Sequence, residues 1–196
     1  DVIEHHISRG NMKVLNMLNT KYFIEQGQAG PVAKLNTEAM GNAWFVDSVS
    51  IQPNADAEVD ALGEFNPATT ALVDKRFESF IADFTPAADS SASIQLVEYY
   101  PNRLVYSSKS SVNQLAVFSE IYYDKGWKAY IDGVEAPHFR ANYILRAMAI
   151  PAGEHKVEFE FKPAMFAVGK AVDLASSLLI ILLFVGWAGF GAYKEF

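Results

Sequence analysis

The 196-residue sequence contains no cysteine, which excludes disulfide bonds and thiolate metal sites. Basic residues are scarce as well, since none lies between Lys34 and Lys75, a stretch that holds seven acidic residues. With a formal net charge of -7, the chain lacks the clustered lysine and arginine that binding to nucleic-acid phosphates requires. We therefore expect no nucleic-acid partner, and we expect a hydrophobic core alone to hold the fold together.

Recognisable catalytic and metal-binding motifs are also absent. No GxSxG, Walker or strand-following GxGxxG pattern occurs, so we assign no catalytic residue and no cofactor. His5 and His6 are adjacent, so they point apart, and no further ligand follows at a useful spacing for a metal. Asp56, Glu58 and Asp60 have the spacing of a calcium loop, but its glycine and closing glutamate are missing. We interpret these three acids as a solvated helix face.

One long hydrophobic run is present towards the end of the chain. Residues 174–193 contain no charge, and as a helix they would span about 30 Å, the thickness of bilayer hydrocarbon. The alternative is a buried core helix, but such helices are usually shorter and keep a polar face. The run therefore predicts one transmembrane helix, with the lipid bilayer as partner. Lys170 and Asp173 precede it, and Lys194 beyond it favours a cytoplasmic tail.

The residues before this run indicate a mainly β fold. A short amphipathic helix, broken by Gly10, is predicted in residues 7–19, and another short helix is predicted after the N-cap residue Asn54. Runs rich in β-branched and aromatic residues predict strands at 21–26, 32–36, 43–51 and, seven times, within 93–161. We predict an antiparallel, jelly-roll-like β-sandwich with short flanking helices and one C-terminal transmembrane helix.

Local patterns support this division of the chain. Asp132-Gly133 is typical of a two-residue hairpin turn, and residues 155–161 alternate between apolar and charged side chains, as a half-buried strand does. Only Lys162 and Pro163 separate that strand from the membrane helix, which keeps the sandwich close to the bilayer. We predict three parts: an N-terminal helical segment (1–20), an extracytoplasmic β-sandwich domain (21–162), and a transmembrane helix with a short tail (163–196).

An aromatic stretch supplies the one candidate ligand site. Large rings and planar hydrogen-bonding groups alternate after Phe118, and protein surfaces that bind sugars use this mixture. The candidate ligand-binding residues are Tyr122, Tyr123, Trp127, Tyr130, Arg140, Asn142, Tyr143 and Arg146. The other interpretation is core packing, because every second ring on a strand points inward. Both interpretations remain open at this stage.

Three runs carry a resemblance to a known family. They are NMKVLNMLNTKYFI, FNPATTALVDKRF and, above all, FSEIYYDKGWKAYIDGVEAPHFRANYILRAMAIPAGEHKVEFEFKP. These runs resemble the C-terminal part of the YfhO-type bacterial membrane proteins, in a form typical of Bacteroidetes. The resemblance implies a large membrane protein that looks like a polyprenyl-phosphate-sugar-dependent glycosyltransferase, with a soluble β-rich region before a last helix. The catalytic loop of such enzymes lies near the N-terminus, outside the matching runs.

The resemblance leads to a first hypothesis on function. The chain would be an accessory extracytoplasmic domain of a glycosyltransferase in the cytoplasmic membrane, which binds or positions a cell-envelope glycan. The alternative is a non-catalytic structural module that packs on the remaining membrane domain of the same protein or on a partner. A third hypothesis is a complete single-pass surface protein, although the sequence begins at Asp1 rather than methionine, from which we expect a piece of a longer chain.

Overall fold

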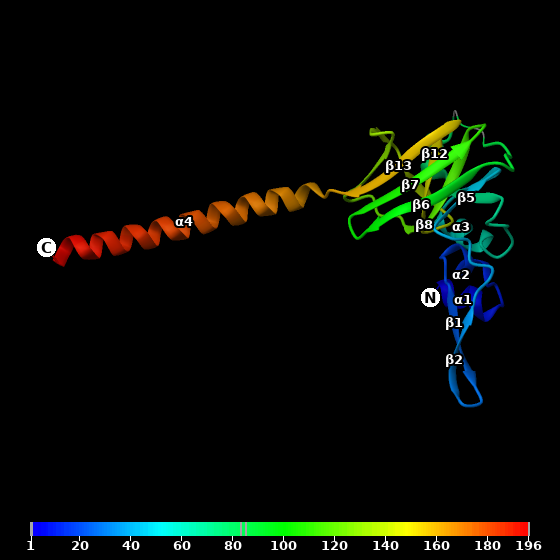
Figure 1. Cartoon of the computed structure of the whole chain (residues 1–196), viewed down its shortest axis with the longest axis horizontal. Helices are drawn as coiled ribbons and strands as arrows, with labels where there is room; N and C mark the ends of the chain where they lie inside the picture. The colour runs from blue at the N-terminus through cyan, green and yellow to red at the C-terminus, as the bar shows by residue number, and fades with distance from the viewer. Residues whose placement is uncertain (1, 83, 85, 196) are drawn as a thin grey trace.

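The computed structural model describes residues 2–82, 84 and 86–195, which form a β-rich body with one long projecting helix (Figure 1). Two antiparallel sheets make up most of the body. The first has five strands, in the spatial order β10 (Val134–Ala136), β9 (Trp127–Ile131), β13 (Gly153–Phe161), β7 (Arg103–Ser110) and β6 (Ser93–Tyr100). The second has four, in the order β11 (Phe139–Ala141), β12 (Leu145–Ile150), β8 (Gln114–Ile121) and β3 (Ala43–Val46).

Shorter elements lie next to the second sheet or extend from the body. Two antiparallel strands form a hairpin that extends away from the body, β1 (Tyr22–Gly27) and β2 (Gly30–Leu35) (Figure 1). A parallel pair consists of β4 (Ser48–Gln52) and β5 (Thr70–Asp74), and of these β5 was not predicted. The short helices are α1 (Val2–Ser8), α2 (Lys13–Met17), α3 (Ala55–Ala61) and the 3-10 helix η1 (Lys75–Phe80). Gly10, at φ 77°, separates α1 from α2, and Asn54 caps α3 as predicted.

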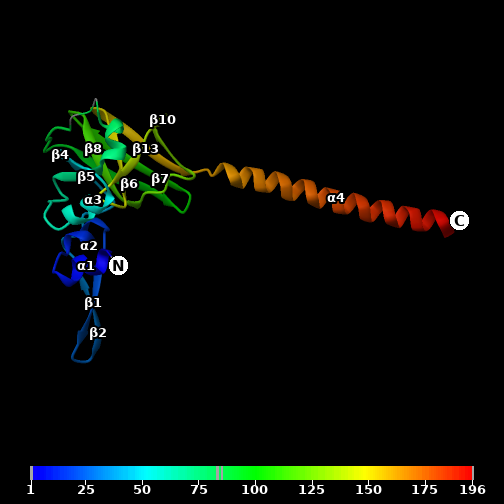
Figure 2. The same ribbon diagram turned by 180° about the vertical axis from the view of Figure 1, so that it is seen from behind.

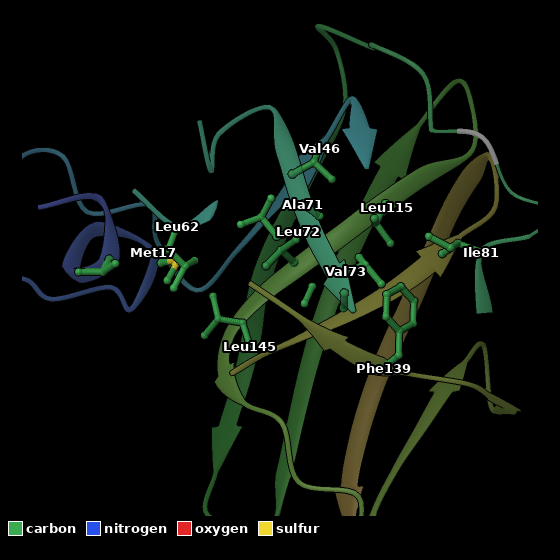
Figure 3. Close-up of a cluster of buried hydrophobic side chains, with 14 residues drawn as sticks. Met17, Val46, Leu62, Ala71, Leu72, Val73, Ile81, Leu115, Phe139 and Leu145 are labelled. Carbon is green, nitrogen blue, oxygen red and sulfur yellow. The ribbon is translucent and has the colours of Figure 1, made fainter. Parts of the chain in front are cut away.

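The four-stranded sheet is buried on both faces. On β8, the side chains of Leu115 and Val117 pack in a cluster with side chains from β5 and from the region of the short helices (Figure 3). Ala116 and Phe118 point to the other side and pack against the five-stranded sheet. Side chains on a strand alternate between the two faces of the sheet. A strand that is covered on both faces therefore has an uninterrupted run of apolar residues in its sequence. The body therefore has three layers, and the four-stranded sheet is the middle one.

The five-stranded sheet has one buried face and one solvent-exposed face. On β13, Val157 and Phe159 are buried against the middle layer, while Glu158 takes part in ion pairs on the outside. The predicted hairpin turn is present, with Asp132 at φ 51° and Gly133 at φ 83°. The predicted fold class is confirmed: the chain is mainly antiparallel β, with short helices and one C-terminal apolar helix.

The last helix, α4 (Ala164–Glu195), leaves the body two residues after β13 ends (Figure 2). Its segment Val168–Trp187 has a mean hydropathy of 2.1, is not buried against the body, and is long enough to cross a bilayer. This segment begins six residues before the uncharged run predicted from Leu174, and so includes Lys170. The side chain of Lys194, on which the predicted orientation depends, and residue 196 lie outside the described part of the structure.

Candidate functional site

The eight predicted ligand-binding residues do not form one continuous platform. On β9, Trp127 and Tyr130 are three positions apart, so they lie on opposite faces of the strand. Trp127 packs between the sheets, and Tyr130 is on the outer face. The eight are found between the two large sheets (Trp127, Arg146), where β11 meets β5 and α3 (Arg140, Asn142, Tyr143), and at the surface (Tyr122, Tyr123, Tyr130).

Arg146 is buried in β12, and no carboxylate in the part of the chain that the structure describes lies within 4 Å of its guanidinium nitrogens. Its guanidinium carbon lies 4.1 Å from the centre of the Trp127 ring and 5.3 Å from that of Phe159. Its Nε donates a hydrogen bond to the carbonyl oxygen of Ile121 at 3.1 Å, and among the described residues no partner satisfies its Nη1. Stacking on aromatic faces, rather than an ion pair, therefore stabilises this buried cation.

Ionisable and aromatic side chains surround this arginine. We call the set the Arg146 cluster: Tyr106, Glu120, Trp127, His138, Arg146 and Phe159. Burial lowers the pKa of His138 to about 4, with the charge of Arg146 as a second cause. Burial also raises the pKa of Glu120, although the charge of Arg146 opposes this shift. At neutral pH the cluster therefore holds a neutral imidazole next to a buried cation.

The chemistry of the Arg146 cluster fits packing better than sugar stacking. One face of the Trp127 ring is covered by the Arg146 guanidinium, and the ring centre of Phe161 lies 5.3 Å away. Tyr106 and Phe159 are fully buried, so neither is accessible to a glycan. Of the two interpretations left open for Trp127, the core-packing one has the better geometric support.

Arg140 lies in a second, differently built cluster. Its Nη2 is 2.8 Å from Oε2 of Glu58 and 3.4 Å from Oδ2 of Asp74. Arg76 donates two hydrogen bonds from Nε and one from Nη2 to the same Asp74 carboxylate. We call Glu58, Asp74, Arg76, Arg140 and Tyr143 the Arg140 cluster. Every charge in it has an opposite charge within 4 Å.

The pKa values in the Arg140 cluster follow from this pairing. Burial raises the pKa of Glu58, while the Tyr143 backbone N–H and Arg140 oppose the shift. The hydrogen bond from the Arg76 side chain lowers the pKa of Asp74. A buried carboxylate is tolerated here because an arginine and a backbone N–H both stabilise its ionised form.

The Arg140 cluster holds a strained turn in place. Asn142 and Tyr143 have φ values of 49° and 71°, in the left-handed region that costs a non-glycine residue about 1–2 kcal/mol. The Asn142 side chain accepts a hydrogen bond from the Leu72 N–H at 2.9 Å, and its own N–H donates to the Leu72 carbonyl at 2.8 Å. The Tyr143 N–H donates to Glu58 at 2.7 Å. These bonds tie the loop after β11 to β5 and α3.

The structure corrects one prediction in this region. Asp56 and Asp60 are exposed, but Glu58 is fully buried, so its assignment to a solvated helix face was wrong. The signal was present in the sequence, because Glu58 shares a helical stripe with the apolar residues Val59 and Leu62, at spacings of one and four residues. An acid on an apolar stripe indicates a buried partner of opposite charge.

The three surface tyrosines are not equivalent. Tyr122 is half-buried, with its ring centre 5.7 Å from those of Phe77 and His138. Tyr123 is exposed, just after β8. Tyr130 has the Lys162 ammonium 5.9 Å from its ring centre. Of these three tyrosines, Tyr123 is therefore the most accessible to a ligand from solution, while Tyr122 and Tyr130 are both partly buried.

Comparison with known proteins gives a family match for the second half of the body. Residues 79–173 match the family model described as bacterial membrane protein YfhO. The chain carries a YfhO-type region. No curated protein and no solved structure gives a match. The YfhO-type region includes β6–β13, the Arg146 cluster and the start of α4, whereas Glu58 and Asp74 precede it. Together with the apolar helix, this match indicates that the chain is located at a membrane.

Proposed function

We propose that the chain is a non-catalytic accessory domain of a YfhO-like membrane glycosyltransferase, standing on the extracytoplasmic side of the cytoplasmic membrane. Its task is structural: it packs on the remaining membrane domain of that protein and holds it in place. The observation that supports this role is the connection between body and helix. Only Lys162 and Pro163 separate β13 from α4, and the backbone on both sides of them is hydrogen-bonded.

Through this connection, the membrane helix restricts where the body can lie relative to the membrane. The Phe161 N–H donates to the Asn102 carbonyl at 2.9 Å, and the Lys162 N–H donates to the Gly126 carbonyl at 2.7 Å. Lys162 is thus bound to the body, and Pro163 has a fixed φ, so these two residues do not behave as a flexible linker, whose backbone is free to sample many conformations. The body is therefore held at a defined place near the helix.

Lengthening the connection tests the structural role. We expect that four Gly-Ser residues inserted after Lys162 reduce sugar transfer by the whole protein, measured as labelled envelope glycan in cells, while the melting temperature of the body stays unchanged. A matched insertion in the exposed β1–β2 turn, between Gly27 and Gly30, should leave transfer unaffected. Full transfer after the first insertion would contradict the structural role.

A second candidate function, binding of an acceptor glycan, is favoured by the exposed ring of Tyr123 and the partly exposed ring of Tyr130. The full chain in detergent can be titrated with envelope glycans. The structural role predicts no glycan binding, and a loss of about 3 kcal/mol in unfolding free energy for Trp127→Ala, at the lower end of the range for tryptophans because Trp127 is partly buried. Glycan binding instead predicts that Tyr130→Ala weakens affinity with unchanged stability.

A further inference from the structure

Exposed aromatic side chains gather at the end of the body from which α4 leaves. Tyr99 and Tyr100, at the end of β6, are 63% and 56% exposed, and Tyr123 is 48% exposed. Phe161 is the last residue of β13, and Ile121, the last residue of β8, is also exposed. We call these five residues the membrane-proximal rim.

Backbone pairing places the rim beside the membrane helix. The turn between β6 and β7 is next to the end of β13, because the Phe161 N–H donates to Asn102, and Tyr100 pairs with Arg103 just before that turn. Figure 1 shows this turn near the start of α4. β8 runs antiparallel to β12 and ends at the same side of the body, as does the segment that leads to Gly126.

The start of α4 sets limits to the height of the rim above the lipid. Four residues, 164–167, precede the segment Val168–Trp187 and rise about 6 Å, whereas ten residues, 164–173, precede the uncharged run from Leu174 and rise about 15 Å along the helix, a height that tilting of the helix reduces. The headgroup layer on one side of a bilayer is about 5–8 Å thick. Lys170 lies within the apolar segment, but its ammonium is 4.9 Å from the ring centre of Phe166, one turn nearer the body. That orientation directs the charge towards the headgroups.

The residue types in the rim also suit a position in the headgroup layer. Tyrosine is enriched at membrane interfaces because its ring is apolar and its hydroxyl group is hydrated. Lys125, exposed next to the rim, suits a lipid phosphate, whereas Lys162 beside it is already paired with Glu160. At the opposite end of β9, the exposed Val134 follows the Asp132-Gly133 turn with no aromatic residue beside it in the chain.

We propose that the membrane-proximal rim inserts into the headgroup layer of the bilayer that α4 crosses. The occupant of this surface is phospholipid, and α4 together with the rim sets the tilt of the body over the membrane. The proposal depends on the membrane location of the chain and not on sugar transfer, so it survives or fails independently of the proposed function.

Site-specific labelling tests the proposal directly, since the chain has no native cysteine. Tyr100→Cys and Tyr123→Cys are labelled with bimane in the full chain, reconstituted in nanodiscs of phosphatidylethanolamine and phosphatidylglycerol. Val134→Cys, at a position 72% exposed, is the matched control. We expect headgroup-nitroxide lipids to quench both rim probes several-fold more than the control probe. Equal quenching at all three positions would overturn the proposal.

Two further measurements deal with the cases in which a variant misfolds or the rim binds a ligand other than lipid. Tyr99→Cys supplies a second rim position, and an unchanged circular dichroism spectrum identifies the variants that fold. Soluble envelope glycan is then added to the labelled nanodiscs. A rim that binds glycan would show a glycan-dependent change in bimane emission without lipid quenching, which also overturns the lipid assignment.

Discussion

Two arginines that lie opposite each other in the β11–β12 ladder are buried in contrasting ways. Arg140 is paired with Glu58 and Asp74, whereas Arg146 stacks on Trp127 and makes one side-chain hydrogen bond, to a backbone carbonyl. In the first case, removal of the arginine leaves the buried carboxylate of Glu58 without a counter-ion, while Asp74 keeps Arg76. In the second, it leaves mainly aromatic rings. The two positions should therefore respond very differently to the same substitution.

The largest effect is expected for Arg140→Met. Glu58 is fully buried, and the removal of one partner of a buried ion pair typically costs about 3–5 kcal/mol because the other charge stays uncompensated. Urea unfolding of the full chain in detergent, followed by tryptophan fluorescence, measures this loss. Combined with Glu58→Gln, the Arg140→Met substitution should cost clearly less than it does alone. Equal costs in both backgrounds would mean that the pair does not interact.

Gly126 lies just before Trp127, the ring on which Arg146 stacks. The substitution Gly126→Ala tests whether the fold requires a glycine at this position. Gly126 has φ 121°, and an added Cβ would lie 2.8 Å from Cε2 of Phe161 and 3.0 Å from Cβ of Pro163. Backbone strain and crowding together should lower the unfolding free energy by about 2–3 kcal/mol. Gly133→Ala is the control, because Gly133 has φ 83° but open space around it, so it should lose only the part due to strain. Equal losses would argue against crowding of the added Cβ by Phe161 and Pro163.

A pH effect is expected from the Arg146 cluster. The folded pKa of His138 is about 4, below the ordinary value near 6.5, so the unfolded state binds more protons between these pH values. The contribution of His138 to the stability of the folded state should therefore fall as the pH drops, by about 2 kcal/mol between pH 7 and pH 5. Three groups act in the opposite direction because their pKa values are raised in the folded state: His155 by its hydrogen bond to Asp132, and Glu58 and Glu120 by burial.

The contribution of His138 is isolated by comparing the wild type with His138→Gln. The variant should lose less stability on acidification, as measured by urea unfolding at both pH values. Because Arg146 is a second cause of the low pKa, Arg146→Met should reduce the pH dependence as well. An identical pH dependence in wild type and His138→Gln would show that His138 is not buried in this way.

Sequence patterns predicted the parts of the fold that rest on local periodicity. The alternation in β13, the turn at Asp132-Gly133 and the apolar helix all follow from side-chain spacing along one element, and all three are present. The short strand β5 was not predicted, because five residues give little periodicity and its partner β4 is parallel. Such pairing depends on residues that are distant in the sequence.

The candidate site was harder to predict for the same reason. Glu58 and Arg140 are 82 residues apart, and only the folded arrangement of α3 and β11 brings them together. The separation of Trp127 from Tyr130, by contrast, could be read from their odd spacing on a strand. Residue type alone suggested one aromatic and arginine-rich platform, but strand parity and long-range ion pairs divide these residues between three places.

The smallest effect is expected for Arg146→Met, and it sharpens the contrast with Arg140. The substitution removes a stacking interaction worth up to about 2 kcal/mol in a desolvated site and one hydrogen bond, but it also removes the cost of burying a charge. Methionine has a flexible thioether that packs well against the Trp127 ring. We expect the unfolding free energy to change by less than about 1 kcal/mol, measured alongside Arg140→Met under the same conditions. A loss as large as that of Arg140→Met would show that Glu120 or another group pairs with Arg146 strongly, and that the two arginines are buried by the same means.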